Sequence, residues 1–407
     1  MTQTKKNIAI LVLGMHRSGT SALTRVINLA DWTGAKTLMR AAESNEAGHW
    51  ESLPVVKIDD RILAALDRGW ADPKPVGEDW KARPEIAAFG DQACDAIAGE
   101  FEGAGQIVLK DPRLSRLLPF WIEALAIKGY EARCLIAARH PLEIANSLAR
   151  RDGMARDHAL LLWQSHMIEA EYHSRGLPRA LISYDAVLSD WPASLASAMD
   201  AIGVPFAPDP SATEKIDGFL DPRHRHAALS ADTILEADDI AQPFKDLYSA
   251  LHDGPLDANA ERFDRLRQDW LAVWEERSPG SGASSYATDL PVNFVEQSQA
   301  LEDEGQVEEA IAMARKAVEA NPSISKHRHH LGTLLFRQGM LDEAGAVFCR
   351  AIALYPKEAR YHHSHAKLLR QLERLDEARS AASRAVELEP DNRVFRRYLT
   401  QILAADQ

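Results

Sequence analysis

Residues 8–21 read Ile8-Ala-Ile-Leu-Val-Leu-Gly-Met-His-Arg-Ser-Gly-Thr-Ser21, an apolar run of strand length that passes directly into a turn with two glycines. Gly14 and Gly19 have the spacing of a nucleotide-binding phosphate loop, but the lysine that such a loop carries after its second glycine is missing. The glycines let backbone N–H groups turn toward one anion, and the following helix adds its positive dipole end. That dipole contributes only about 0.3–1 kcal/mol per charge at exposed sites. Binding of an anion at this turn therefore also needs a cationic side chain, and Arg17 is placed to supply it.

Apolar runs of strand length recur along the first half of the chain, at residues 8–13, 107–109, 133–138 and 180–183. Helical stretches separate or follow them, at residues 21–29, 114–127, 142–151 and 193–202. Strands that alternate with helices predict a parallel sheet covered by helices on both faces.

Ligands bind such sheets beyond the carboxyl ends of the strands. The residues directly after the later runs are polar, and they read Lys110-Asp-Pro-Arg113, Arg139-His-Pro141 and Tyr184-Asp185. The sequence therefore predicts a functional site at this edge of the sheet.

The turn after the first strand resembles a known phosphate-binding element. Arg17-Ser-Gly-Thr-Ser21 is similar to the 5′-phosphosulfate loop of sulfotransferases that use PAPS (3′-phosphoadenosine 5′-phosphosulfate), in which Lys or Arg precedes Ser-Gly-Thr. Arg139, with Ser147 eight residues later on the next helix, resembles the 3′-phosphate site of the same family. The resemblance implies seven residues that bind PAPS: Arg17, Ser18, Gly19, Thr20, Ser21, Arg139 and Ser147.

Three further segments resemble bacterial sulfotransferases: Lys110-Asp-Pro-Arg113 with Leu118-Pro-Phe-Trp121, Asn45-Glu-Ala-Gly-His-Trp-Glu51, and Ile182-Ser-Tyr-Asp185. Together with the two phosphate elements they place the resemblance within residues 7–230. The fold that it implies is α/β, the P-loop-like parallel sheet flanked by helices of the sulfotransferases.

Sulfuryl transfer resembles phosphoryl transfer, so positioning and neutralising the leaving oxygen matter more than covalent chemistry by the protein. Arg17, Thr20 and the loop amides are expected to do this, and no metal is expected. Glu51 is the candidate base for the acceptor, because related enzymes often use a Glu base and Glu51 lies in a polar segment before a helical stretch. His49 is the rival candidate for the base. The alternative to a catalytic role for Glu51 is a solvated surface residue. Lys110 and Arg113 are candidates to contact the sulfate or acceptor, and the alternative is a strand end that is salt-bridged to Asp111.

A cationic run, Arg223-His-Arg-His226, is the other basic feature of this region. Such a run can close over phosphates, although a solvated charge cluster is the commoner explanation.

The last third of the chain repeats itself with a period of 34 residues. Pro322, Pro356 and Pro390 share this interval, as do two sets of alanines, 310/344/378 and 317/351/385. Small residues let paired helices approach, and proline ends the second helix of each pair. The pattern resembles the tetratricopeptide repeat (TPR) family and predicts three repeats, followed by a capping helix from residue 391.

The segment 278–285, Ser-Pro-Gly-Ser-Gly-Ala-Ser-Ser, has the composition of a linker. We therefore expect a sulfotransferase domain at residues 1–277, a linker at 278–290 and a TPR solenoid at 291–407. The array is expected either to pack or oligomerise the protein, or to bind a peptide or a partner protein.

Composition limits the remaining possibilities. The 407 residues carry a formal charge of −13, which argues against general binding of nucleic acid or anionic membranes. The first apolar run is too short for a membrane span, and three scattered cysteines fit a reducing compartment, so a cytoplasmic protein is expected. The acceptor cannot be deduced: a glycan, lipid, peptide or small metabolite fits, and the TPR array favours an extended one.

Two other functions fit the same residues. One is an ATP-dependent kinase or other phosphotransferase with an atypical phosphate loop. The other is a non-catalytic TPR scaffold on a degenerate phosphate-loop domain. The missing loop lysine argues against the first, and the presence of every expected loop and phosphate residue argues against the second.

Overall fold

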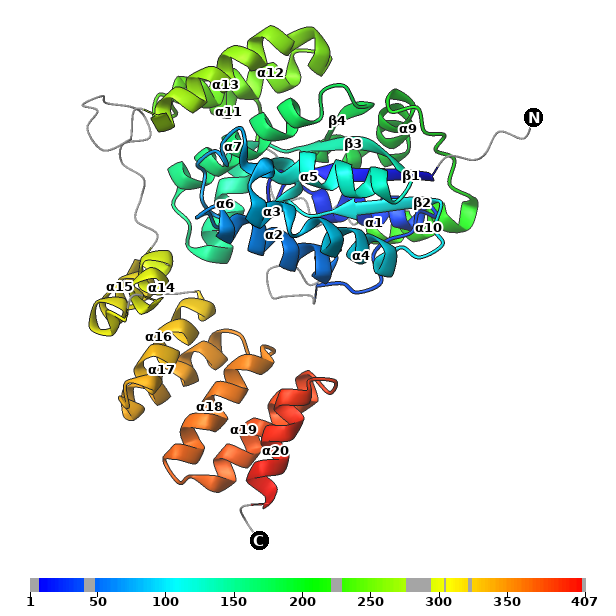
Figure 1. The fold of residues 1–407 in the computed structure, drawn as a ribbon. Coiled ribbons are helices and arrows are strands. Elements are labelled where there is room, and N and C mark those ends of the chain that lie inside the picture. The colour runs from blue at the N-terminus through cyan, green and yellow to red at the C-terminus, as the bar shows by residue number, and fades with distance from the viewer. Residues whose placement is uncertain are drawn as a thin grey trace. The chain divides into compact units, whose positions relative to one another are not determined.

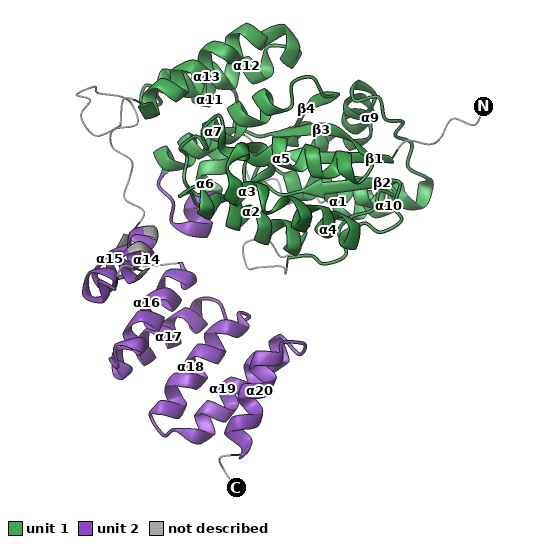
Figure 2. Cartoon of the chain, in the orientation of Figure 1, with its two compact units in different colours: residues 1–40, 47–147, 156–290 green, residues 41–46, 148–155, 291–407 purple. Residues whose placement is uncertain are grey.

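The computed structural model describes residues 7–39, 48–220, 229–275, 294–303, 305–320 and 324–404. The chain divides into two compact units (Figure 2). The first comprises residues 1–40, 47–147 and 156–290, and the second comprises residues 41–46, 148–155 and 291–407. The expected linker at 278–290 and the cationic run at 223–226 lie outside the described residues.

The first unit contains a four-stranded sheet in which every neighbouring pair is parallel, as the sequence predicts (Figure 1). Its strands are β1 (Asn7–Leu13), β2 (Gln106–Lys110), β3 (Tyr130–Ala138) and β4 (Arg179–Ser183). The spatial order is β2-β1-β3-β4. After β1 the chain continues to β2 at one edge of the sheet, and after β3 it continues to β4 at the other edge. The carboxyl ends of β1 and β3 are therefore the topological switch point of the sheet.

Helices cover both faces of the sheet. The even-numbered residues of β1, with partners from the other strands, pack against α1 (Thr20–Leu29) and α9 (Trp191–Ala201) in one apolar core. Ala9, Leu11 and Leu13 of β1 are also buried, and α5 (Leu114–Ile127) contacts β1 and β3. Burial on both sides explains why these strands are continuously apolar rather than alternating.

The other described elements of the first unit complete its helical layers and the segments between them. They are α2 (Leu53–Ala65), η1 (Trp80–Ala82), α3 (Pro84–Ala87), α4 (Gly90–Glu100), α6 (Pro141–Asp152), α7 (Arg156–His173), α8 (Tyr184–Ser189), α10 (Pro210–Phe219), α11 (Asp232–Leu235), α12 (Gln242–His252), η3 (Leu256–Asn259) and α13 (Ala260–Glu275). The last turn of α6, from residue 148, is assigned to the second unit.

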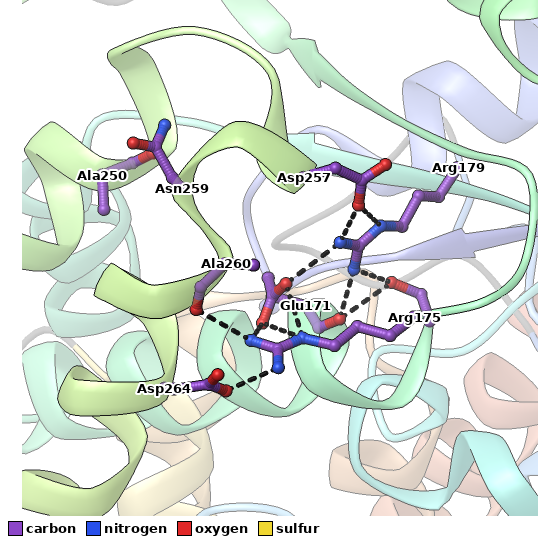
Figure 3. Close-up of polar contacts among 9 residues, drawn as sticks. Glu171, Arg175, Arg179, Ala250, Asp257, Asn259, Ala260 and Asp264 are labelled. Atoms are coloured by element: carbon purple, nitrogen blue, oxygen red, sulfur yellow. Dashed lines mark hydrogen bonds and ion pairs between the residues drawn. The ribbon is translucent and has the colours of Figure 1, made fainter.

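A charged network fixes η3 and α13 at the amino end of β4 (Figure 3). Arg179 donates to the Asp257 carboxylate at 2.5 Å and to the Glu171 carbonyl at 2.6 Å. Arg175 bridges the carboxylates of Glu171 and Asp264, at 2.8 and 2.5 Å. Because the charges satisfy one another and lie at the end of the sheet opposite the loop between β1 and α1, we assign the network to structure.

The second unit consists of successive helices, α14 (Phe294–Asp303), α15 (Val307–Ala320), α16 (Ser325–Arg337), α17 (Leu341–Leu354), α18 (Ala359–Gln371), α19 (Leu375–Leu388) and α20 (Arg393–Ala404). The six repeat-defining alanines are all buried between them. The turns before α15, α17 and α19 have positive φ at Gly305, Gly339 and Glu373, at 77°, 74° and 57°. Glu373 thus adopts the conformation for which the other repeats use glycine. The expected capping helix is α20.

Two histidines, the half-buried His329 and the buried His363, pack on aromatic rings between successive repeats. His329 lies on Tyr361 with ring centroids 4.8 Å apart, and His363, one period later, lies 4.7 Å from Phe395. Burial lowers the pKa of both histidines to about 4, helped by Arg360 near His329 and by Lys367 near His363.

We expect these two histidines to make the array labile to acid. A lowered pKa in the folded state means that the unfolded chain takes up the protons first. The stability that these histidines contribute is therefore complete above pH 6.5, falls as the pH drops toward 4 and levels off below it. The full shift in pKa corresponds to about 3 kcal/mol per histidine, and because both rings are partly screened by solvent we expect a loss of about 2 kcal/mol each. Hydrogen exchange of α16 and α18 in the intact chain, corrected for intrinsic rates, measures it.

The His329→Gln/His363→Gln variant is the control for this acid effect. In this variant the protection of α16 and α18 against hydrogen exchange should fall much less between pH 6.5 and 4 than it does in the parent chain. An equal decline in the variant would show that other groups cause the acid sensitivity.

Candidate functional site

The candidate site is built on the loop between β1 and α1, at the switch point of the sheet. Gly14 has a φ of 130°, and a Cβ there would lie 2.7 Å from the Ala137 carbonyl oxygen. Gly19 has a φ of 87°, and a Cβ there would lie 2.1 Å from the Tyr184 ring. Both positions therefore require glycine, for backbone conformation and for space.

The N-terminus of α1 has the features of an anion site. Gly19 caps the helix without a side-chain hydrogen bond, and the first turn, which begins at the buried Thr20, contains no acidic residue. Ser18 is fully buried, and its hydroxyl has no hydrogen-bond partner among the described residues. A buried hydroxyl without a partner is costly, and a bound phosphate or sulfate oxygen at this helix end would satisfy it.

The two elements that resemble the PAPS site meet directly. Arg17 donates from Nε to the Ser147 hydroxyl at 2.8 Å, although 130 residues separate them. Arg139 donates from Nη1 to the Arg17 carbonyl at 3.0 Å and pairs with Glu143 at 2.8 Å. Its guanidinium lies 5.0 Å from the centre of the Tyr184 ring. Arg17 itself has a φ of 71°, which is uncommon for a residue other than glycine.

The candidate base forms a buried ion pair with the lysine that ends β2. Lys110 Nζ lies 2.5 Å from Glu51 Oε1, and both residues are 3% exposed. Lys110 also donates to the Ser21 hydroxyl at 3.1 Å and to the His49 carbonyl at 3.2 Å. Ser21 in turn donates to that carbonyl at 3.0 Å. Lys110 therefore ties the candidate base to the first turn of α1.

A second charged group lies just beyond β2. Arg113 pairs with Asp111 at 3.1 Å and with Asp60 of α2 at 2.8 Å, which matches the salt-bridged alternative for this strand end. Asp59 is buried and accepts from Trp121 Nε1 at 2.7 Å. Burial raises the pKa of Asp59 well above its ordinary value, and the neighbouring Asp111 raises it further.

Some residues at this edge were not expected from the sequence. Ser115, in the first turn of α5, accepts from the Gly14 amide at 2.9 Å. Glu143 neutralises Arg139, and only its i+4 spacing from that arginine could have indicated the pair. Trp70 lies against His16 of the loop, with ring centroids 4.9 Å apart, and no sequence pattern links the two.

None of the helices among the described residues has the length and apolar character that a membrane span requires. Within the same ranges, no three His, Cys, Asp or Glu side chains are grouped so that they could hold a metal ion.

Comparisons with known proteins characterise the second unit. Family models of the tetratricopeptide repeat match residues 295–359 and 359–392. No sulfotransferase family model matches the chain, and no curated protein matches it.

Similar solved structures include TPR domains. The first TPR domain of human RPAP3 is 24% identical over 28% of this chain and 88% of that chain, with a TM-score of 0.27. The second, in complex with an HSP70 peptide, is 19% identical over 27% and 91%, with a TM-score of 0.26. The Yersinia enterocolitica secretion chaperone SycD, in complex with a YopD peptide, is 21% identical over 30% and 98%, with a TM-score of 0.27.

The chain thus combines an α/β unit around a four-stranded parallel sheet with a helical unit. Residues 295–392 of that helical unit are tetratricopeptide repeats.

Proposed function

We propose that the first unit is a sulfotransferase that moves a sulfuryl group from PAPS to a hydroxyl or amine of an acceptor. The observation that supports this most is the 2.8 Å hydrogen bond between Arg17 and Ser147. The two residues come from separate segments that resemble the two phosphate sites of one cofactor. Their contact supports the proposal that one PAPS molecule binds to both segments.

In this proposal the loop amides, the Ser18 hydroxyl and the N-terminus of α1 hold the 5′-phosphosulfate. Arg139 and Ser147 hold the 3′-phosphate. In the structure Arg139 pairs with Glu143, and Ser147 accepts from Arg17. A 3′-phosphate would therefore replace the Glu143 carboxylate on Arg139, and it would accept the hydrogen of the Ser147 hydroxyl, whose oxygen can go on accepting from Arg17. Phosphate can make two parallel hydrogen bonds to an arginine, which favours this exchange.

The reaction breaks the S–O bond to the 5′-phosphate and forms an S–O or S–N bond to the acceptor. The departing phosphate oxygen keeps the bonding electron pair, and Arg17 neutralises its growing charge. The acceptor proton passes to the Glu51 carboxylate. PAPS itself carries the sulfuryl group, so the residues described need only orient the donor, neutralise charge and accept one proton.

The ion pair between Glu51 and Lys110 defines how this base would work. Glu51 must turn from Lys110 toward the acceptor to take the proton, and catalytic hydrogen bonds often form only once substrate is bound. Lys110 is within 3.1 Å of Ser21 in the first turn of α1. When Glu51 turns, the ammonium of Lys110 would be free to face the sulfuryl group held at that turn.

Titration with the desulfated product, 3′-phosphoadenosine 5′-phosphate (PAP), tests the donor site without an acceptor. We expect PAP to bind at least tenfold more tightly than AMP or ATP, because only PAP reaches Arg139 and Ser147. Arg139→Ala should remove most of this preference, and Arg17→Ala should weaken PAP binding as well. Arg156→Ala, which removes an exposed arginine on α7, should change neither.

Two outcomes would contradict this proposal. Tight binding of ATP with no benefit from a 3′-phosphate would favour a phosphotransferase. A complete lack of nucleotide binding would favour a scaffold that retains only the shape of a phosphate loop.

The tetratricopeptide repeats support a second part of the proposal, that the array binds a protein partner through a peptide segment. A photocrosslinker at Lys367, an exposed position of α18, should then form a saturable protein adduct that a partner peptide prevents. The same label at the exposed Lys36 of the first unit should not. Equal labelling from both positions would contradict a role for the array.

A further inference from the structure

The segment from residue 67 to residue 77 is an irregular loop that the surrounding helices hold by its backbone. Arg116 of α5 donates to the carbonyls of Asp72, at 2.8 Å, and Lys74. His158 of α7 bonds the Ala71 carbonyl at 2.7 Å. Arg68, inside the loop, donates to the Pro75 carbonyl at 3.3 Å. Four of its carbonyls are therefore fixed by side chains.

The residues that hold this loop are buried. Arg116 is 1% exposed, and burial lowers the pKa of its guanidinium. Burial also lowers the pKa of His158. Placing a charged guanidinium in the interior is costly unless its hydrogen bonds are satisfied, and here loop carbonyls satisfy two of them. A loop that only connects two helices through solvent does not need buried side chains to hold its carbonyls. Hydrogen bonds of this kind are expected where a loop must keep one of its side chains in a fixed position.

The side chain that this loop presents is Trp70. Its indole is half-buried and meets the His16 ring edge-on, with centroids 4.9 Å apart and an interplanar angle of 66°. His16 directly precedes Arg17 in the phosphate loop. The ring of His166 lies 6.3 Å from His16, and burial lowers the pKa of His166 to about 3, so its imidazole is neutral. An aromatic surface therefore adjoins the loop proposed to hold the sulfuryl group.

The charges at the end of β2 restrict what can approach this surface. Both cations there already pair with carboxylates, Lys110 with Glu51 and Arg113 with Asp111 and Asp60. Burial raises the pKa of the neighbouring Asp59 and so favours its neutral form. The three carboxyl groups of Glu51, Asp60 and Asp111 still outnumber the two cations here, in a chain whose formal charge is −13. An anionic acceptor would be repelled, whereas an uncharged one would not.

We infer that Trp70 forms one wall of the acceptor site and that the acceptor is an uncharged, hydroxyl-bearing ring whose apolar face packs on the indole. This inference rests on the proposed sulfotransferase function and adds the class of acceptor to it. A neutral sugar and a phenol share this chemistry. A polyanionic glycan or an acidic peptide does not, and the excess of carboxyl groups at the end of β2 disfavours both.

Calorimetric titration of the intact chain saturated with PAP tests the inference. The probes are chitotetraose as a neutral sugar, 2-naphthol as a phenol, and a uronic-acid tetrasaccharide as the anionic comparison. We expect one of the two neutral probes to bind, and the anionic probe to bind at least tenfold more weakly. Trp70→Ala should weaken the neutral probe at least tenfold, and Trp70→Phe should restore most of the binding.

Controls separate this inference from the proposal beneath it. Tyr172→Ala removes a partly exposed aromatic side chain on α7 and should leave every affinity unchanged. PAP should bind Trp70→Ala within twofold of its affinity for the parent chain. Three outcomes would overturn the acceptor site alone if PAP binds normally. They are that no neutral probe binds, that Trp70→Ala has no effect, or that the anionic probe binds more tightly than the neutral ones. Failure of PAP itself to bind would overturn the donor site, and the acceptor site with it.

Discussion

Replacing Lys110 with methionine should destabilise the first unit by about 3–5 kcal/mol, because the Glu51 carboxylate then stays buried without its partner. Lys110 and Glu51 are each 3% exposed, so water cannot replace the lost ammonium without local opening. Urea unfolding followed by tryptophan fluorescence of the intact chain measures the change.

The reciprocal variant and the double variant show whether the pair itself is responsible. Glu51→Gln leaves a buried ammonium and should also destabilise the unit. Lys110→Met/Glu51→Gln removes both charges and should recover more than half of the loss, because uncharged groups need no ionic partner. The exposed pair of Lys36 and Glu102 is the matched control, and Lys36→Met should cost less than about 1 kcal/mol. Additive losses in the double variant would contradict a direct pairing.

The same variants separate stability from catalysis. If Glu51 is the base, Glu51→Gln and the double variant should both lower kcat about 10²–10⁴-fold, even where the double variant regains stability. PAP affinity should fall far less than kcat, because Glu51 does not bind the donor in this proposal. An active double variant would show that Glu51 is a structural residue and would move the search for the base to His49.

Gly19→Ala should cost about 3 kcal/mol of stability, from the left-handed backbone and from the collision with Tyr184. The Gly19 φ is 87°, and the new Cβ would lie 2.1 Å from the Tyr184 ring. Because Gly19 is the N-cap of α1, any shift of the loop also turns its amides away from the anion. PAP affinity should therefore fall more than tenfold, as calorimetric titration can measure.

Gly129→Ala is the matched control for this change. Gly129 also has a positive φ, 80°, but a Cβ there would meet nothing within 4 Å. It lies before β3, at the end of the sheet away from the loop. Its substitution should cost only about 1 kcal/mol and leave PAP affinity unchanged. Tyr184→Ala combined with Gly19→Ala should remove the collision but keep the backbone strain. Equal losses from both glycine variants would show that the contact with Tyr184 is unimportant.

Much of the architecture follows from local patterns in the sequence. The four apolar runs became β1 to β4, because strands buried on both faces must be continuously apolar. The 34-residue period located the helices of the array, since each repeat is one helical pair that stacks on the next. The substitution of Glu373 for a turn glycine did not break the pattern, because stacking on both sides outweighs the cost of one left-handed residue.

The candidate site was only partly readable from the sequence. The loop after β1 and the pair Arg139 and Ser147 could be predicted as site residues because each is a short segment after a strand. In the structure the two segments are in contact, through the hydrogen bond between Arg17 and Ser147. Ser115, which accepts from the Gly14 amide, and Glu143, which pairs with Arg139, could not be predicted in this way. They reach these partners only when α5 and α6 pack on the sheet.

The sequence by itself therefore determined the four strands, the repeats, and the positions of the two segments that resemble phosphate sites, because those features have short periods or compact motifs. Only the tertiary structure decided that Glu51 pairs with Lys110, that Arg17 contacts Ser147, and that Trp70 lies against the loop. The partners in these contacts are separated by 59, 130 and 54 residues. Contacts at such distances depend on how the sheet and its helices close on one another, which no local periodicity records.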